Sequence, residues 1–456
     1  MKRRTRLLSA LLTGALLLPL GLTSCTQSVQ VQKCPDAAVR QAEYPEMAPY
    51  PDESDFIRSD GSFDDEGFSK VYDAWYDSRQ NLRSETDLSG LYPFLNKSIP
   101  AFLSGAEGEN RVYSPLNVYM ALAMLSELTD GETRAQVLDL LGVKDLKALR
   151  AQTSALWNAN YCDDGALTSI LASSLWLNDT LDFVPKTLDI LAETYHASTY
   201  QGVMGSDALN KALQNWLNEQ TGGLLKEQAG EIELKDDTVL ALATTLYYKA
   251  RWDWEFFDGN NKEEPFHAPN GDLTCEFMHQ SGSSTYYWGE KFSAVPKALI
   301  ESGSMWLILP DEGVTPEALL QEQELYDFLS AGHEWSKSKF LVVNLGLPKF
   351  DVDSSLDLRE GLKSLGIQDA FDPDRSDFTP IVKDIEGLFL SQAKHAARVT
   401  VDEEGCTAAA FTVMAAAGSA MPPDDEVDFQ LDRPFLFVLT NRDGLPLFVG
   451  VVNTPV

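Results

Sequence analysis

The chain has 456 residues, of which 44% are hydrophobic and 23% charged, and these proportions exclude a wholly disordered protein because they supply a large apolar core. Acidic residues number 69 against 36 lysines and arginines, which gives a net charge of −33 at pH 7. A polyanion of this size is repelled by nucleic acid and by anionic lipid, so neither is an expected partner.

The N-terminus has the pattern of an export signal. A basic stretch at residues 2–6 precedes the uncharged, mostly apolar run Leu7 to Leu22, which is too short and too interrupted by Gly and Pro to span a membrane. The run ends in Leu22-Thr23-Ser24-Cys25, which resembles the bacterial lipobox. We therefore expect residues 1–24 to be a lipoprotein signal peptide and Cys25 to carry the lipid. The protein would then be exported, and either held at the cell surface by this anchor alone or secreted. Ordinary signal cleavage beside an incidental cysteine is the alternative.

The stretch from residue 25 to residue 85 is rich in Asp, Glu, Pro, Ser and Gln. This composition is typical of a solvated linker, so we expect a flexible acidic tether that ends in a helix carrying Val71, Trp75 and Tyr76. No linker-like change of composition follows, and residues 86–456 are predicted to form a single domain.

Helical and strand patterns are mixed along this domain. Ser114-Pro115 is a favourable helix start, and apolar residues at helical spacing predict a helix over residues 115–129. Two further helices are predicted from Gly131 to Gly142 and over residues 207–220. Apolar runs predict strands at residues 171–177, 239–248, 305–309, 341–345, 435–439 and 447–452. The absence of a regular βα repeat indicates the α+β class.

The common catalytic motifs are missing from the sequence. It contains no GxSxG, GxxxxGK[ST] or GxGxxG motif, and its five histidines include no HExxH. The scattered cysteines form no CxxC pair, so we expect neither a metal site nor a cofactor. His395 is better interpreted as a structural residue than as a general base.

The most unusual segment runs from Gly405 to Pro423, nineteen residues without a charge, and reads GCTAAAFTVMAAAGSAMPP. Together with the preceding residues, "VTVDEEGCTAAAFT" resembles the hinge of the reactive-centre loop of serpins, a family of serine protease inhibitors. The resemblance extends over residues 86–456. Other segments that match in the family's order are "NRVYSPLNVYMALAMLSELTDGETRAQVLDLLG", "LATTLYYKARWDWEF", "LPKFDVDSSLDLREGLKSLGI" and "DRPFLFVLTNRDGLPLFVGVVNTPV".

The resemblance implies a serpin fold, with a large central β-sheet, two further sheets, about eight or nine helices and an exposed reactive-centre loop at about residues 403–426. It also implies a monomeric suicide inhibitor that is not an enzyme, whose partner is a target serine protease held in a covalent acyl complex. The cleaved loop would insert into the central sheet as a new strand. A non-inhibitory serpin that acts as a binding or chaperone-like lipoprotein is the alternative. No basic helix face of the heparin-activated kind is present, so we expect no heparin activation.

Alternation of side chains along an inserted strand sets the residue requirement. By analogy with the family, one set faces the core and contains nothing larger than a methionine; its members are Cys406, Ala408, Ala410, Thr412, Met414, Ala416 and Gly418. The other set places the bulky Phe411 outward. A charge in the first set would be buried without a partner. The extended length from Cys406 to Ser419 is roughly 45 Å, long enough to cross the molecule.

The family pattern places the reactive bond between Ser419 and Ala420, with Gly418 or Met421 as neighbouring registers. A small residue at this position favours elastase-like or subtilisin-like proteases, because trypsin-like pockets require a basic residue. The predicted hinge residues are Glu403, Gly405, Cys406, Thr407, Ala408, Ala409, Ala410 and Thr412.

The resemblance also implies supporting sites away from the loop. Glu403 is expected to pair with Lys349 at the top of the sheet, and Trp252 matches the tryptophan of the breach, beneath the insertion point. The shutter set, under the middle of the sheet, comprises Ser114, Asn117, Thr244 and His395. Asn117 stands where the family usually has Ser, and Thr244 where it usually has Asn. We interpret this as a swap that keeps one amide and one hydroxyl around His395.

Overall fold

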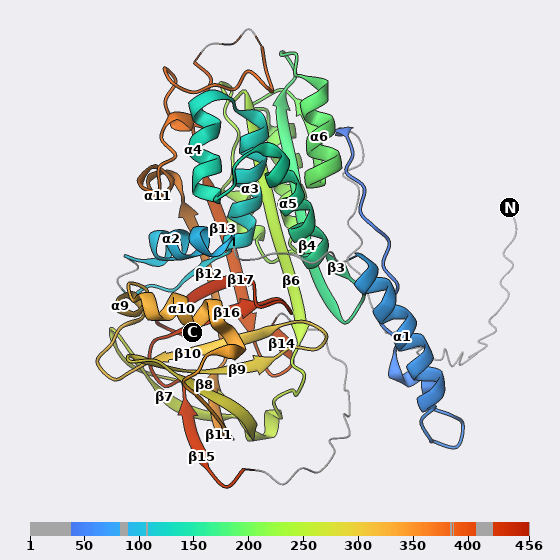
Figure 1. The fold of residues 1–456 in the computed structure, drawn as a ribbon, viewed down its shortest axis with the longest axis vertical. Helices are drawn as coiled ribbons and strands as arrows, with labels where there is room; N and C mark the ends of the chain where they lie inside the picture. The colour runs from blue at the N-terminus through green and yellow to red at the C-terminus, as the bar shows by residue number, and fades with distance from the viewer. Residues whose placement is uncertain are drawn as a thin grey trace, which may run out of the picture.

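The computed structural model describes residues 38–82, 90–105, 108–383, 385, 387–406 and 423–455 (Figure 1). Within these ranges the chain forms two large β-sheets and eleven α-helices, eight of which have nine or more residues. The predicted α+β class is confirmed. No helix in the described part of the chain has both the length and the apolar character needed to cross a membrane.

The central sheet contains eight strands. Its order is β1(Ala38–Arg40), β5(Ala197–Gly202), β4(Leu167–Asn178), β6(Leu240–Arg251), β14(Gly405–Cys406), β13(Lys394–Val401) and β12(Phe350–Asp357), and β3(Cys162–Asp163) pairs with β4. The pairing is antiparallel except between β4 and β5. Figure 1 shows the long strands β4, β6 and β13 running along the molecule beneath a layer of helices.

The second sheet contains nine strands. Its order is β15(Glu426–Gln430), β11(Ser338–Pro348), β8(Gly271–Trp288), β9(Phe292–Ala298), β10(Ser304–Pro310), β16(Phe435–Thr440), β17(Pro446–Val452) and β2(Arg111–Tyr113), and β7(Lys262–Ala268) pairs with β8. The two further sheets that were predicted are therefore joined, through a short ladder between β8 and β9.

The helices are α1(Asp65–Leu82), α2(Tyr92–Leu103), α3(Pro115–Leu128), α4(Gly131–Leu141), α5(Leu146–Asn160), α6(Pro185–Tyr195), α7(Asp207–Gln220), α8(Lys226–Gly230), α9(Pro316–Leu319), α10(Gln323–Ala331) and α11(Arg359–Ser364). Local signals explain three of the four that were predicted. Ser114 caps α3 and Pro115 occupies its first turn, Gly142 ends α4 with a φ of 70°, and Ser206 caps α7. The predicted strands are also present, and every residue of β16 and β17 is buried.

Residues 38–82 lie within the range where composition predicts a flexible tether, but they pack against the domain. β1 pairs with the edge of β5, and Trp75 in α1 is only 2% exposed. The predicted helix with Val71, Trp75 and Tyr76 is present as α1. Composition missed the packing because the aromatic residues that dock this segment are spread among many acidic ones.

Candidate functional site

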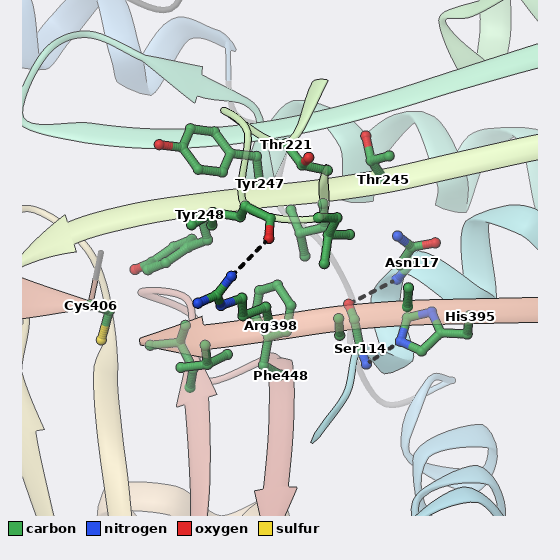
Figure 2. Close-up of a pocket in the computed structure, with 17 residues that line it drawn as sticks. Ser114, Asn117, Thr221, Thr245, Tyr247, Tyr248, His395, Arg398, Cys406 and Phe448 are labelled. Carbon is green, nitrogen blue, oxygen red and sulfur yellow. Dashed lines mark hydrogen bonds between the residues drawn. The ribbon is translucent and has the colours of Figure 1, made fainter. Parts of the chain in front are cut away.

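An opening in the central sheet lies between β6 and β13. The short strand β14 separates the two strands at one end, and its residues Gly405 and Cys406 pair with β6 on one side, while Cys406 also pairs with Val401 of β13 on the other. Beyond β14, no ladder joins β6 to β13 among the residues that the structure describes. A pocket lies between them, and Figure 2 shows Cys406 at one end of it and His395 toward the other. At the β14 end, β6 and β13 each lie one strand spacing from β14, so the two strands are roughly 10 Å apart.

The turn from β13 into β14 is held at three consecutive carbonyl groups. The indole Nε1 of Trp252 donates to the carbonyl of Asp402 at 2.9 Å. The backbone amides of Phe256 and Trp252 donate to the carbonyls of Glu403 and Glu404 at 3.0 and 2.9 Å. The carboxylate of Asp402 closes the turn by accepting from the amides of Glu404 and Gly405. Residues 252–256, which follow β6, therefore hold the first residues of the hinge in place.

Gly405 and Cys406 fit tightly at the start of the opening. A Cβ atom on Gly405 would lie 2.2 Å from the carbonyl oxygen of Ala250, so only glycine allows this close approach of two strands. Cys406 is 1% exposed, and its burial raises the pKa of the thiol well above the usual value. The side chain of Cys406 thus faces the core, as the alternation argument expects for this position.

The structure brings Glu403 and Lys349 together at 2.6 Å, within a larger network. The ammonium group of Lys349 also lies 2.8 Å from Glu276 of β8. The amide of Asn261 donates to both carboxylates, to Glu276 at 3.0 Å and to Glu403. Two carboxylates therefore share one cation and one amide, and Glu276 and Asn261 are site residues that sequence analysis did not identify.

The network shifts the pKa of each ionisable member. Partial burial disfavours ionised Glu403, but hydrogen bonds from Lys349 and Asn261 outweigh it and hold the pKa of Glu403 below its ordinary 4.5. Burial likewise opposes the charge of Lys349, yet the hydrogen bonds to Glu276 and Glu403 raise its pKa above 10.5. The network therefore stabilises the fold between pH 4.5 and 10.5. This stabilisation is lost as pH falls through the lowered pKa of Glu403 or rises through the raised pKa of Lys349.

We expect Glu403→Lys to promote loop–sheet polymers on warming, because it replaces the attraction to Lys349 by repulsion and frees the hinge. An ion pair with this partial exposure contributes only about 1 kcal/mol, so the polymers should form slowly and not at once. Size-exclusion chromatography of samples held below the melting temperature measures the monomer that remains. Glu404→Lys is the matched control, because it makes the same charge change one residue outside the network. Equal polymer from the two variants would contradict the expectation.

Three of the shutter residues, Ser114, Asn117 and His395, line the pocket near the N-terminus of α3 (Figure 2). Asn117 accepts a hydrogen bond from the hydroxyl of Thr244, and its amide donates to the carbonyl of Thr244 at 3.3 Å. His395 instead accepts at Nε2 from the amide of Ser114, at 3.0 Å. The amide–hydroxyl pair therefore forms beside His395, and within the described ranges no hydrogen bond joins the ring to Asn117 or Thr244.

Burial lowers the pKa of His395 from 6.5 to about 4. The unfolded chain takes up a proton between these values while the folded chain does not, so stability should fall as pH drops from 6.5 toward 4. The loss amounts to about 3 kcal/mol at pH 4. His395→Gln keeps an acceptor for Ser114 but does not titrate, so urea unfolding at pH 7, 5.5 and 4.5 should show a shallower pH dependence in this variant. Parallel curves for the two proteins would contradict the assignment.

Trp252 lies beneath the hinge and is fully buried. Next to it, the ammonium group of Lys297 is 4.5 Å from the ring centre of Phe256 and 5.6 Å from that of Trp252, and it donates to the carbonyl of Trp254. Burial lowers the pKa of Lys297 to about 7, although Asp253 opposes the shift. Lys297 thus contacts residues 252–256, the segment whose amides and indole bind the hinge carbonyls.

A segment after α7 crosses the opening. The guanidinium of Arg398 on β13 donates to the carbonyl of Leu224 at 3.3 Å, and Gln228 of α8 donates to Asp353 of β12. Leu224 and Leu225 line the pocket together with residues of β6. A new strand between β6 and β13 would therefore have to pass beneath this crossing.

Several predicted site residues lie outside the described ranges. These are the lipidation site Cys25, the hinge residues Thr407, Ala408, Ala409, Ala410 and Thr412, and the reactive-bond residues Ser419 and Ala420. The hinge residues Glu403, Gly405 and Cys406 are described, and so are the ion-pair, shutter and breach residues.

Comparison with known proteins gives a consistent result. The family model described as serpin (serine protease inhibitor) matches residues 98–455. A pig (Sus scrofa) leukocyte elastase inhibitor is 31% identical over 389 residues, which cover 83% of this chain and 99% of the relative. The crystal structure of tengpin, a thermophilic serpin, in its native state superposes with a TM-score of 0.71 at 24% identity, covering 82% of this chain and 96% of tengpin. A thyroxine-binding globulin in complex with thyroxine superposes with a TM-score of 0.66 at 21% identity, covering 80% and 98%.

Proposed function

The chain belongs to the serpin family of serine protease inhibitors, and we propose that it is a suicide-substrate inhibitor of elastase-like or subtilisin-like proteases. In this proposal the protease binds residues 407–422 as a substrate, and each inhibitor molecule is used only once. The protease cleaves the bond between Ser419 and Ala420, and the segment that remains joined to Cys406 enters the central sheet.

The observation that carries the proposal is the opening between β6 and β13 with β14 already at its end. A strand that continues from Cys406 would lie between β6 and β13, which no ladder joins beyond β14 in the described part of the chain. Main-chain hydrogen bonds to both edges would stabilise it whatever its sequence, while the buried face requires small, uncharged side chains. Ala408 and Ala410 meet this requirement.

The protease supplies the catalytic groups that cleave the peptide bond, and the inhibitor has only to stop the reaction before the ester on the protease is hydrolysed. The protease serine attacks the carbonyl carbon of Ser419, the bond to the nitrogen of Ala420 breaks, and that nitrogen leaves as an amine. The carbonyl then remains as an ester on the protease. Insertion of the loop would place this ester roughly 45 Å from the hinge at Cys406 before water hydrolyses it. The small side chain of Ser419 suits a small primary pocket, and the name of the pig relative supports the same protease class.

Incubation of the protein with pancreatic elastase, subtilisin and trypsin tests this proposal. We expect elastase or subtilisin to form an adduct that survives heating in detergent and to release a peptide that begins at Ala420. Trypsin should form no such adduct. Ser419→Arg should reverse the preference, since only the residue in the primary pocket changes.

Turnover of the chain by every protease without an adduct would overturn the proposal and favour the non-inhibitory alternative. An adduct with a peptide that begins at Ser419 or Pro422 would shift the reactive bond by one or two residues and leave the mechanism in place.

A further inference from the structure

A small polar cavity lies between residues 38–82, called the N-terminal segment below, and the two sheets. Its volume is about 20 Å³, which is room for a single water molecule or small ion. The N-terminal segment, the end of α5 with β3, the strands β4 and β6, and two turns of the second sheet form its walls. Figure 1 shows α1 of the N-terminal segment beside β3, at this end of the central sheet. The cavity therefore includes residues that precede the part of the chain matched by the family model.

The guanidinium of Arg79, on α1, lacks a close acceptor at this cavity. Arg79 lines the cavity and is 8% exposed, and its Nη1 forms no hydrogen bond within the described part of the chain. The carboxylate Oδ2 of Asp164 lies 3.7 Å from Nη1, whereas a charge-assisted hydrogen bond is roughly 2.8 Å long. That oxygen instead accepts from Nε1 of Trp75 at 3.2 Å. Because a buried donor without an acceptor is costly, this position favours a ligand that accepts hydrogen bonds.

The hydroxyl of Ser169, on β4, is a second unsatisfied donor on the cavity wall. Ser169 is 2% exposed, and its Oγ has no partner among the described residues. Other polar side chains on the wall bind one another: the amide of Asn441 donates to Asn160 at 2.9 Å, and the hydroxyls of Tyr248 and Ser302 are hydrogen-bonded. The Ser169 hydroxyl is thus available to the occupant of the cavity, together with the guanidinium on α1.

The charges around the cavity favour an anion over water. Among the residues that the structure describes, no Asp or Glu lines the cavity, whereas Arg79 and Arg442 both do. Asp164 offsets part of the charge of Arg79, but from outside this lining and at a long distance. A water molecule accepts a hydrogen bond without neutralising the buried charge, and an anion does both. This local excess of positive groups occurs in a chain whose net charge is −33.

We propose that the cavity binds one small monovalent anion of the size of chloride, with Arg79 and Ser169 as its ligands. A cavity of about 20 Å³ has no room for an anion of many atoms such as gluconate. The bound ion would link α1 of the N-terminal segment to β4 of the central sheet, and so stabilise the docking of this segment. The site acts without the reactive-centre loop, so this inference is independent of the proposed inhibition of proteases.

Replacement of sodium gluconate by sodium chloride, at pH 7 and constant ionic strength, tests the site in the full-length protein. Constant ionic strength keeps the screening of surface charges the same throughout. The melting temperature should rise with chloride and then saturate, by about 2 °C at roughly ten times the dissociation constant, because the ion binds only the folded chain. Chlorine NMR provides a direct measurement, since exchange with a protein site broadens the chloride resonance. Added bromide should compete for the site and narrow it again.

Three variants assign the ion to this cavity. Arg79→Gln removes the buried charge and should abolish both the saturable rise in melting temperature and the broadening. Ser169→Ala removes one hydrogen bond and should weaken chloride binding about fivefold. Arg58→Gln is the matched control, because it removes an exposed arginine of the same segment that pairs with Asp64. This control should bind chloride as the parent chain does.

Equal melting temperatures of the parent chain in the two salts would overturn the proposal, and so would broadening no greater than that of Arg79→Gln. Broadening that persists unchanged in both Arg79→Gln and Ser169→Ala would place the chloride elsewhere, and it would overturn the assignment as well. If Arg79→Gln does not fold, Ser169→Ala still decides the question. An affinity for chloride equal to that of the parent chain would then count against the site.

Discussion

Cleavage between residues 407 and 422 should raise the melting temperature of the protein by more than about 10 °C. The edges of β6 and β13 that face the opening have no ladder between them beyond β14, in the residues that the structure describes. An inserted strand of about a dozen residues would pair with both edges, and each hydrogen bond contributes about 1 kcal/mol net. Each kcal/mol raises the melting temperature of a large domain by a degree or more, so the gains add to a large shift.

Differential scanning calorimetry of the intact and the cleaved protein, with cleavage confirmed by mass spectrometry, measures this shift. An ordinary protein cut in an exposed loop melts at the same temperature or lower, since a cut adds freedom to the chain and removes no strain. A cleaved protein that melts at or below the temperature of the intact one would therefore contradict insertion, whatever the fate of the protease.

Ala410→Glu should convert the inhibitor into a substrate, whereas Ala409→Glu should leave most inhibition intact. Cys406 is buried in β14, so alternation along a continuing strand places Ala410 on the core face and Ala409 on the opposite face. A carboxylate at Ala410 would have to enter the pocket beneath the sheet without a partner, at a cost of several kcal/mol. Insertion would then be too slow to outrun hydrolysis of the ester.

The two variants are a matched pair, because they make the same change one residue apart. Titration of a fixed amount of elastase gives the number of inhibitor molecules consumed for each protease inactivated. We expect a ratio near one for the parent chain and for Ala409→Glu, and cleavage with little or no inactivation for Ala410→Glu. The cleaved Ala410→Glu chain should also lack the rise in melting temperature. Loss of inhibition in both variants, or in Ala409→Glu alone, would show that the assignment of faces is wrong.

Much of the fold was predictable from the sequence because the signals are local. Ser114 and Pro115 start α3, and Gly142 ends α4, through contacts within one or two turns of the chain. The apolar runs of β16 and β17 mark strands that are buried on both faces. The small side chains around Ala408 and Ala410 likewise specify a segment able to enter a sheet, since the requirement is one of size and charge at every second position.

Sequence patterns alone thus predicted four of the helices, six of the strands, the fold class and the chemical character of the loop. The packing of residues 38–82 against the domain emerges only from the folded chain. The same is true of the network in which Glu276 and Glu403 share Lys349 and accept from Asn261, and of the bonds from Thr244 to Asn117 and from Ser114 to His395. These contacts join residues that lie between 15 and 281 positions apart in the chain. They exist because strands and helices stack in one register, and the free energy of that register comes from the whole core and from no single segment.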